Sequence, residues 1–422
     1  MKRILDLYNH SSLILRILIG MVLGAVLAFL LPQAAWIKTL GTLFVGALKA
    51  IAPVLVAVLV AASLCQGTAR LDSRFGLVIF LYLFSTYLAS FTAVVASFVF
   101  PQTITLSAAV AAQEAAAAPG GLGEVVDSLL KNIVANPVRA VADANYLGIL
   151  FWAVVLGLAL KKFASKETQL VLLNLSDAVT EVVRWIINLA PFGICGLVYT
   201  AVAESGLEIF TTYGKLLVLL VATMLAVALV INPIIVFFVL RRNPYPLVLR
   251  CLRESGFTAF FTRSSAANIP VNMELCKKLG LDRDMYSVSI PLGSTINMDG
   301  AAVTITIMAL ATAHTLGIPV SLPTAMLLSF LSALAACGTS GVTGGSLLLI
   351  PMACSLFGIP ADISMQVVGV GFIIGVVQDS METAINSSGD ALFTATAEYA
   401  HWKKTGRSLP TFLGGTTKLE EE

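Results

Sequence analysis

Six apolar segments occupy most of the first 243 residues of the chain, and the longest connection between them is the loop 101–146. The lengths of the segments are of the order of the roughly 20 helical residues that cross a hydrocarbon core about 30 Å thick. The pattern therefore predicts six membrane-spanning helices in this half. They cover residues 12–31, 42–64, 77–100, 146–160, 180–203 and 215–240.

Beyond residue 243 the apolar segments are interrupted by Ser, Thr, Gly and Asn, at 262–270 and at 338–346. Irregular backbone persists at membrane depth only where it is buried in protein or lines a water-filled cavity. We predict a re-entrant hairpin tip at each interruption, where free N–H groups suit a carboxylate and carbonyl oxygens suit Na⁺. A helix containing Asn, Gly and Asp follows each tip, which suggests an internal repeat.

A polar stripe follows directly on the apolar run 367–377. Its five residues share one face of a helix with 3.6 residues per turn: Asp379, Glu382, Thr383, Asn386 and Asp390. A charge at bilayer depth costs about 2.5–3.5 kcal/mol, so such residues usually face a cavity, an ion path or one another. The segment 297–300, Asn-Met-Asp-Gly, again combines an amide, a carboxylate and a glycine beside apolar sequence. Two such sites suggest ion-coupled transport.

Each of these features, taken alone, has a structural interpretation. Gly and Ser clusters in membrane helices often serve close packing. A single carboxylate such as Asp299 or Asp390 can be satisfied by neighbouring donors. Tyr82, Ser85 and Thr86 share a face of the third span, where hydroxyl groups commonly bond to the backbone. The functional interpretation rests on the features occurring together.

Composition places the chain among polytopic membrane proteins, because 58% of its residues are hydrophobic and only 12% are charged. Basic residues gather before span one and after spans two, four and six, which predicts that both termini are cytoplasmic. Arg16 lies within the first apolar segment and no cleavage site precedes a soluble domain, so we expect no removable signal peptide. The net charge of +2 reflects the loop bias and implies no nucleic-acid partner.

The cysteine and histidine residues predict neither a metal site nor an enzyme. The six cysteines lie in or beside apolar segments with no CxxC spacing, so we expect buried free thiols and no disulfide. The histidines are scattered at His10, His314 and His401, which fits neither a zinc site nor a Ser-His-Asp arrangement.

Four motifs, in order along the chain, carry a resemblance to a known family. They are Thr-Arg-Ser-Ser at 262–265, Pro-Leu-Gly-Ser-Thr-Ile-Asn-Met-Asp-Gly at 291–300, Gly-Thr-Ser-Gly-Val at 338–342, and the acidic segment 379–390. With its six simple spans, essentially the whole chain resembles the dicarboxylate/amino acid:cation symporter family of glutamate and neutral amino-acid transporters. Within that family it looks most similar to the bacterial sodium-dependent serine/threonine symporters.

The resemblance implies an all-α polytopic membrane fold of the elevator type, with about eight transmembrane helices and two re-entrant helical hairpins. Residues 1–243 would form mainly a scaffold of spans one to six, with span three and part of span six contributing to the transport domain. Residues 244–400 would form the transport core of hairpin 1, helix 7, hairpin 2 and helix 8, and 401–422 a cytoplasmic tail. A homotrimer in the lipid of a bacterial inner membrane is also implied.

Na⁺ is the coupling ion that the resemblance implies, and hard oxygen ligands suit it. One ion site of the family matches Gly293, Asn297, Asn386 and Asp390. A second matches Thr295, Met298 and the backbone of Ala336, Cys337 and Thr339. A third matches Tyr82, Ser85, Thr86, Asn297 and Asp299.

The resemblance also assigns groups around an amino-acid substrate. Asp379 matches the partner of the α-ammonium, and Val342 would cap the pocket. The α-carboxylate would lie near Ser264, Ser265 and Asn386.

At Glu382 the chain departs from the pattern of the family, and this departure bears on the choice of substrate. Transporters of acidic amino acids place an arginine at this position, where it pairs with the side-chain carboxylate of the substrate. A glutamate repels that group, whereas a small hydroxyl can donate to Glu382, with Thr383 one position further on. We therefore predict sodium-coupled symport of L-serine and L-threonine into the cell.

Alternatives stay open at this stage. Arg263 reaches the same pocket in a second interpretation, where it pairs with Glu382 or supplies the missing cation. Thr343 and Ala301 stand where relatives often have proline and threonine, which bears on hairpin geometry and ion affinity. A proton- or sodium-coupled carrier of alanine, glycine or dicarboxylates is the alternative transporter. An amino-acid-binding membrane receptor or channel is the alternative of a different class.

Overall fold

The computed structural model describes residues 13–65, 73–106, 134–143, 145–206, 208–337 and 344–419. These ranges are almost entirely helical and contain no β-strand beyond an isolated bridge between Pro410 and Thr417. The predicted all-α class is confirmed. Within the same ranges five helices are long and apolar enough to cross a membrane, and one bent pair would make a sixth. The chain is therefore built as a multi-pass membrane protein.

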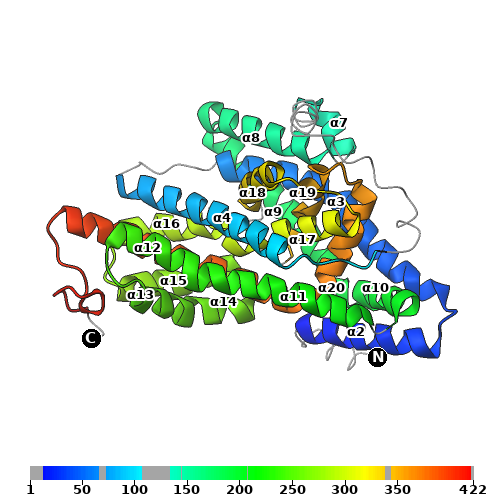
Figure 1. Cartoon of the computed structure of the whole chain (residues 1–422). Helices are drawn as coiled ribbons and strands as arrows, with labels where there is room; N and C mark the ends of the chain where they lie inside the picture. Colours follow the sequence, from blue (N-terminus) through cyan, green and yellow to red (C-terminus); the bar gives the residue numbers. More distant parts are fainter. Residues whose placement is uncertain are drawn as a thin grey trace, which may run out of the picture.

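In the first half of the chain, α3 and α10 pack on each other and on the neighbouring helices. α2 lies against α10, while α3 packs on α8 and α9, and Figure 1 shows α8 and α2 on opposite sides of the bundle. The elements described in this half are α2 (Leu13–Leu30), α3 (Ala35–Cys65), α4 (Ser73–Val99), α7 (Pro137–Ala142), α8 (Tyr146–Phe163), α9 (Lys166–Asn188), α10 (Ala190–Ser205), α11 (Glu208–Ala226), the π-helical turn η1 (Val227–Ile231) and α12 (Asn232–Leu240).

Small residues let α2 and α10 approach each other closely. A Cβ atom at Gly20 would lie 2.2 Å from the carbonyl oxygen of Pro191, and one at Gly24 would lie 2.3 Å from that of Cys195. Close backbone approach of this kind is typical of helix pairs in membranes. The outer face of α2 instead exposes large apolar side chains such as Val22, as a lipid-facing surface requires.

The predicted fifth span, 180–203, is not one helix. α9 ends at Asn188, α10 begins at Ala190, and the two helices meet at 52°. Pro191 explains the break, because proline has no N–H to donate and its ring clashes with a carbonyl of the preceding turn. The other predicted spans fall on α2, α3, α4, α8 and the continuous run from α11 to α12, with ends displaced by several residues.

The second half of the chain consists of shorter helices wrapped around one long helix. Its described elements are α13 (Tyr245–Cys251), η2 (Leu252–Gly256), α14 (Phe257–Thr262), α15 (Ser265–Lys278), α16 (Arg283–Ile296), α17 (Asp299–Thr315), α18 (Leu322–Ala336), η3 (Ser346–Leu349), α19 (Ile350–Ser355), α20 (Ala361–Lys404) and η4 (Thr411–Leu413). The predicted helix at 367–390 is thus confirmed as part of α20.

The first predicted hairpin tip is a sharp turn between α14 and α15. Arg263 takes a left-handed φ of 52°, which is uncommon for a residue with a side chain. Ser264 then caps α15, since its Oγ accepts from the N–H of Ala267 at 3.2 Å. Most of the second tip, residues 338–343, lies outside the described residues. The description resumes at Gly344, whose φ of 71° leads the chain into η3.

α17 and α20 form the centre of the bundle. α20 packs against α4, α11, α14, α15, α16 and α17, and every residue of α17 from Asp299 to Ala313 is buried. Figure 1 shows both helices in the middle of the molecule, between α3 and α11. The polar groups of α17 and of the middle of α20, such as Asp299 and Asp390, are therefore buried within the protein.

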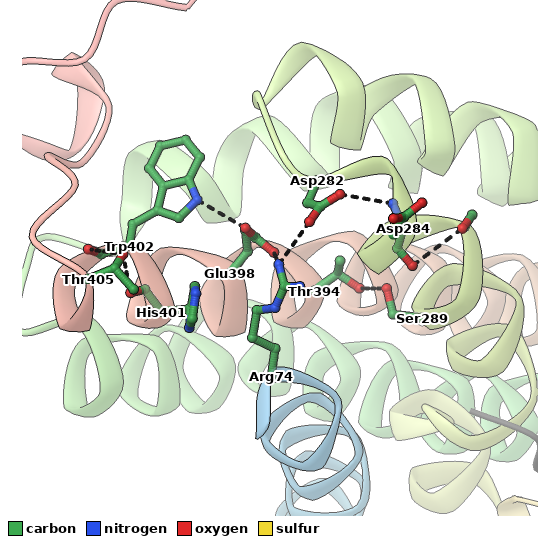
Figure 2. Close-up of polar contacts among 10 residues, drawn as sticks. Arg74, Asp282, Asp284, Ser289, Thr394, Glu398, His401, Trp402 and Thr405 are labelled. Atoms are coloured by element: carbon green, nitrogen blue, oxygen red, sulfur yellow. Dashed lines mark hydrogen bonds and ion pairs between the residues drawn. The ribbon is translucent and has the colours of Figure 1, made fainter. Parts of the chain in front are cut away.

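A polar cluster fastens α4 to the last turns of α20. Arg74 lies between Asp282, at 3.0 Å, and the buried Glu398, at 3.4 Å. Glu398 also accepts a hydrogen bond from the indole N–H of Trp402 at 3.0 Å. Figure 2 shows Arg74 reaching up from α4 to both carboxylates. The cluster joins α4, the start of α16 and α20 at one end of the bundle.

Candidate functional site

The break between α16 and α17 places the carboxylate of Asp299 in a cage of neutral donors. Asp299 Oδ1 accepts from Ser85 Oγ at 2.9 Å and from Thr86 Oγ1 at 3.2 Å. Its Oδ2 accepts from Asn232 Nδ2, on α12, at 2.9 Å. Asp299 is fully buried, and no cation of the described part of the chain pairs with it. The residues that contact the Asp299 carboxylate are all neutral, so none of them compensates a negative charge on it.

Asn297, at the same break, connects α16 to α20. Its Nδ2 donates to the carbonyl oxygen of Asn386 at 2.9 Å and lies 3.1 Å from Asp390 Oδ1. The other oxygen, Asp390 Oδ2, is buried and has no hydrogen-bond partner among the described residues. A carboxylate oxygen buried without a donor is costly unless a cation contacts it. The geometry of Asp390 thus fits a monovalent cation beside Asn297.

Gly293 allows Asp390 and Tyr82 to come this close to α16. A Cβ atom at this position would lie 2.8 Å from both Asp390 Oδ1 and the Tyr82 hydroxyl. That hydroxyl lies 3.0 Å from the carbonyl oxygen of Asp390 and 2.8 Å from Thr394 Oγ1. Thr394 in turn donates to Ser289 Oγ at 2.9 Å, a contact visible in Figure 2.

The residues expected at the second ion site lie around the same break. Gly300 N–H donates to Asn386 Oδ1 at 2.8 Å, and Asn386 Nδ2 lies 3.4 Å from Met298 Sδ. Cys337, just after Ala336 at the end of α18, donates from Sγ to the carbonyl oxygen of Ile296 at 3.4 Å. Thr295 Oγ1 is engaged within α16, where it donates to Leu292 O at 2.7 Å. Thr339 lies outside the described residues.

Asp379 lies between the turn at Arg263 and the segment that resumes at Gly344. Its Oδ2 pairs with Arg263 Nε, from the first tip, at 2.7 Å. Its Oδ1 accepts from the N–H of Gly344, at the exit of the second tip, at 3.0 Å. A carboxylate has about four acceptor positions, so Asp379 retains capacity for a further donor such as an ammonium. The same ion pair holds the left-handed Arg263 in place.

Glu382 lies one turn further along α20 in a different environment. Its Oε2 accepts hydrogen bonds from Thr304 Oγ1 at 2.9 Å, Ser346 Oγ at 2.8 Å and Gln378 Nε2. No described residue donates to its Oε1. Arg263 forms an ion pair with Asp379, and the Arg263–Glu382 pair considered from the sequence stays a prediction. The donors that hold Glu382 Oε2 are neutral.

The remaining residues expected to contact the substrate differ in their surroundings. Thr383 Oγ1 donates to the carbonyl oxygen of Asp379 at 2.8 Å, so its hydrogen is used within α20. Ser265 is buried at the start of α15, and Ser264 acts as the helix cap described above. Val342 lies outside the described residues. The structure brings Asp379 into contact with the first tip, and Glu382 lies one turn further along α20.

Several site residues were missed by sequence reasoning. Asn232 gave a signal, because it is an amide within the apolar run of the sixth span. Gln378 directly precedes Asp379 but does not belong to the polar stripe that begins at Asp379. Thr304 and Ser346 carry hydroxyl groups that no local pattern distinguishes, and only the fold brings them to Glu382.

The arrangement is suited to binding small ions and polar molecules. Among the described residues no group of three or more His, Cys, Asp or Glu side chains could hold a metal ion. The donors are carboxylate, amide, hydroxyl and carbonyl oxygens, which suit a hard cation such as Na⁺.

Comparison with known proteins identifies similar chains. The profile of the sodium:dicarboxylate symporter family matches residues 13–399. The chain is 63% identical over 412 residues to "Serine/threonine transporter SstT" of Bifidobacterium adolescentis, with 98% of this chain and 95% of the relative covered. Proteins of the same name from Streptococcus thermophilus (56% over 405 residues; 96% and 100% covered) and Streptococcus agalactiae (57% over 398 residues; 94% and 98% covered) are also similar.

Proposed function

The chain belongs to the sodium:dicarboxylate symporter family, and from this premise we propose that it carries L-serine and L-threonine into the cell together with Na⁺. Its relatives at 56–63% identity are named serine/threonine transporters. The observation that carries the proposal is the pair Asp379 and Glu382, one turn apart on α20. Asp379 forms an ion pair with Arg263, whereas Glu382 accepts hydrogen bonds from the neutral side chains of Thr304 and Ser346.

The coupling ions are cargo that the buried carboxylates bind. Asp390 and Asn297 form one position for Na⁺, because Asp390 Oδ2 is buried without a donor. Asp299, with Ser85 and Thr86, forms another, because its oxygens are fully buried with only neutral partners. The ions neutralise these carboxylates, which lowers the cost of moving them at membrane depth.

The substrate pocket lies between the hairpins. Asp379 receives the α-ammonium, for which it retains acceptor capacity beside Arg263 and Gly344. Glu382 Oε1 receives the hydroxyl of serine or threonine, because Oε2 is occupied by three donors. The carboxylate of an aspartate or glutamate side chain is repelled by Glu382. A small hydroxyl amino acid is the substrate that satisfies both groups.

The movement that we propose is of the elevator type. Residues 244–400, with α4 and part of the α11–α12 run, form the moving core, and the rest of 1–243 forms the scaffold of a trimer in the inner membrane. Both termini face the cytoplasm, since basic residues gather in the loops on that side. The close packing of α2 on α10 and of α3 on α8 and α9 supports a rigid scaffold.

Uptake of labelled serine by proteoliposomes tests the proposal. An inward Na⁺ gradient should drive accumulation above the external concentration, and threonine should compete while aspartate and glutamate should not. Equal uptake with and without the gradient would contradict sodium coupling. Inhibition by glutamate would contradict the assigned role of Glu382. Binding of serine without accumulation would favour a receptor.

A further inference from the structure

Asn232 is an amide within the sixth predicted span and belongs to none of the four motifs that carry the family resemblance. It lies at the start of α12 and is only 2% exposed. Its Nδ2 donates to Asp299 Oδ2 at 2.9 Å. The side chain therefore connects the α11–α12 run to the buried carboxylate at the break between α16 and α17.

The orientation of this amide follows from its partner. An ionised carboxylate only accepts hydrogen bonds, so the atom that faces Asp299 Oδ2 is the donor, Nδ2. The other end of the amide, Asn232 Oδ1, is buried and has no hydrogen-bond partner among the described residues. A buried acceptor without a partner is unfavourable. Beside a carboxylate, a cation is the partner that satisfies both groups.

A π-helical turn sets the direction in which Asn232 points. η1 spans Val227–Ile231, and the N–H of Asn232 donates to the carbonyl oxygen of Val227, five residues earlier. Such a turn contains one residue more than an α-helical turn, which rotates the residues after it by about 100° around the helix axis. π-Helical turns are frequent at functional sites. Here the turn directly precedes the residue that contacts Asp299.

The groups around the Asp299 carboxylate suit a single monovalent cation. Ser85 and Thr86, on α4, contact Asp299 Oδ1, and Asn232 contacts Asp299 Oδ2. One carboxylate among neutral oxygens matches one positive charge. Cations of the size of Na⁺ and Ca²⁺ hold oxygen ligands at about 2.4 Å. A cation at Asp299 Oδ2 is therefore within reach of the oxygen of the same amide.

We infer that Asn232 is a direct ligand of the Na⁺ at Asp299, through Oδ1, and that its Nδ2 holds the same carboxylate when the ion has left. This inference rests on the proposed function, because it adds a ligand to one of the proposed ion positions. An amide suits both roles, since it accepts at one end and donates at the other. Bound Na⁺ then joins α12 to α4 and to the start of α17.

Binding of labelled Na⁺ to the purified full-length protein in lipid nanodiscs, without serine, tests the inference apart from transport. Asp299→Asn defines the component of binding that belongs to this position. Asn232→Leu should raise the Na⁺ concentration for half-saturation of that component about 10- to 100-fold, the usual effect of losing a group around a bound metal ion. Asn268→Leu is the matched control and should leave it unchanged. Asn268 is also a fully buried amide with an unpartnered Oδ1, but its Nδ2 donates to Ser255 Oγ.

Asn232→Asp separates the ligand role from the hydrogen bond to Asp299. The variant keeps an oxygen in the place of Oδ1 and loses the donor. The comparison is made at pH 9, because two adjoining carboxylates can share a proton that competes with Na⁺. Half-saturation in Asn232→Asp should then need no more Na⁺ than in the native protein. An equal rise in Asn232→Leu and Asn232→Asp would overturn the ligand role and leave Asn232 as a support for Asp299.

Double variants show whether Asn232 and Asp299 belong to one ion position. Asn232→Leu combined with Asp299→Asn should bind Na⁺ as Asp299→Asn alone does, whereas its effect should add to that of Asp390→Asn. Native Na⁺ affinity in Asn232→Leu would overturn the inference and leave the proposed function intact. Absence of Na⁺ binding by the native protein would contradict the proposed function, and this inference with it.

Discussion

Replacing Glu382 by Gln changes one side-chain atom at the position that we propose contacts the substrate side chain. In the structure, Oε2 accepts from Thr304, Ser346 and Gln378. A glutamine at this position keeps these three hydrogen bonds only with its amide oxygen on that side. Its NH₂ group then takes the place of Oε1. In the proposed complex the substrate hydroxyl donates to Oε1 of Glu382, whereas in the variant it meets the NH₂ group, which cannot accept that hydrogen bond.

The size of the effect follows from the bond that is lost. A hydrogen bond to a charged group contributes about 1.5–3 kcal/mol, which corresponds to roughly a 10- to 150-fold weaker interaction. Glu382→Gln should therefore raise the KM for serine and threonine by that factor. Alanine has no hydroxyl, so its KM should change little. The ratio of serine to alanine affinity is the diagnostic quantity.

The assay is initial-rate uptake of labelled serine and alanine by proteoliposomes at saturating Na⁺. Glu274→Gln serves as the control, because Glu274 is 58% exposed on α15 and its nearest cation, Lys277, is 4.0 Å away. An equal loss of serine and alanine affinity in Glu382→Gln would refute the reasoning. It would show that Glu382 supports the pocket and does not contact the substrate side chain.

Other substitutions test the ion site and the packing around it. Asp390→Asn should raise the Na⁺ concentration for half-maximal uptake while the order of substrate preference stays the same, and an unchanged Na⁺ requirement would contradict the assignment. Gly293→Ala places a methyl group 2.8 Å from Asp390 Oδ1, so we expect a destabilisation of about 1–3 kcal/mol and a weaker protection by Na⁺ against thermal unfolding. Arg74→Gln leaves the buried Glu398 without its cation and should lower the melting temperature clearly. Arg184→Gln, in a pair that is 62% and 46% exposed, should not.

The sequence predicted the stripe on α20 well because the helical period alone places its residues on one face. Asp379, Glu382, Thr383, Asn386 and Asp390 are all buried on that helix. The interruption between α14 and α15 was also predicted, since the polar segment after Thr262 interrupts an apolar run. Local periodicity and the cost of polar groups in lipid were sufficient for both.

Local periodicity and the cost of polar groups in lipid do not predict contacts between segments that are distant in the sequence. Arg263 and Asp379 are 116 positions apart, and nothing local to either residue indicates that they pair. The three donors to Glu382 come from α17, η3 and α20 itself, so the environment of this carboxylate depends on how the helices pack. The bend after Asn188 was missed because the apolar run continues across it, although Pro191 carries the backbone signal.

Coupling between serine and Na⁺ is tested most directly by asking whether a serine gradient drives Na⁺ entry. Proteoliposomes are prepared with equal Na⁺ inside and outside and no membrane potential, and an inward gradient of serine is then applied. The account predicts a transient net entry of labelled Na⁺ that is abolished in Asp390→Asn and absent when aspartate replaces serine. Serine entry with no accompanying Na⁺ would contradict sodium-coupled symport by this chain.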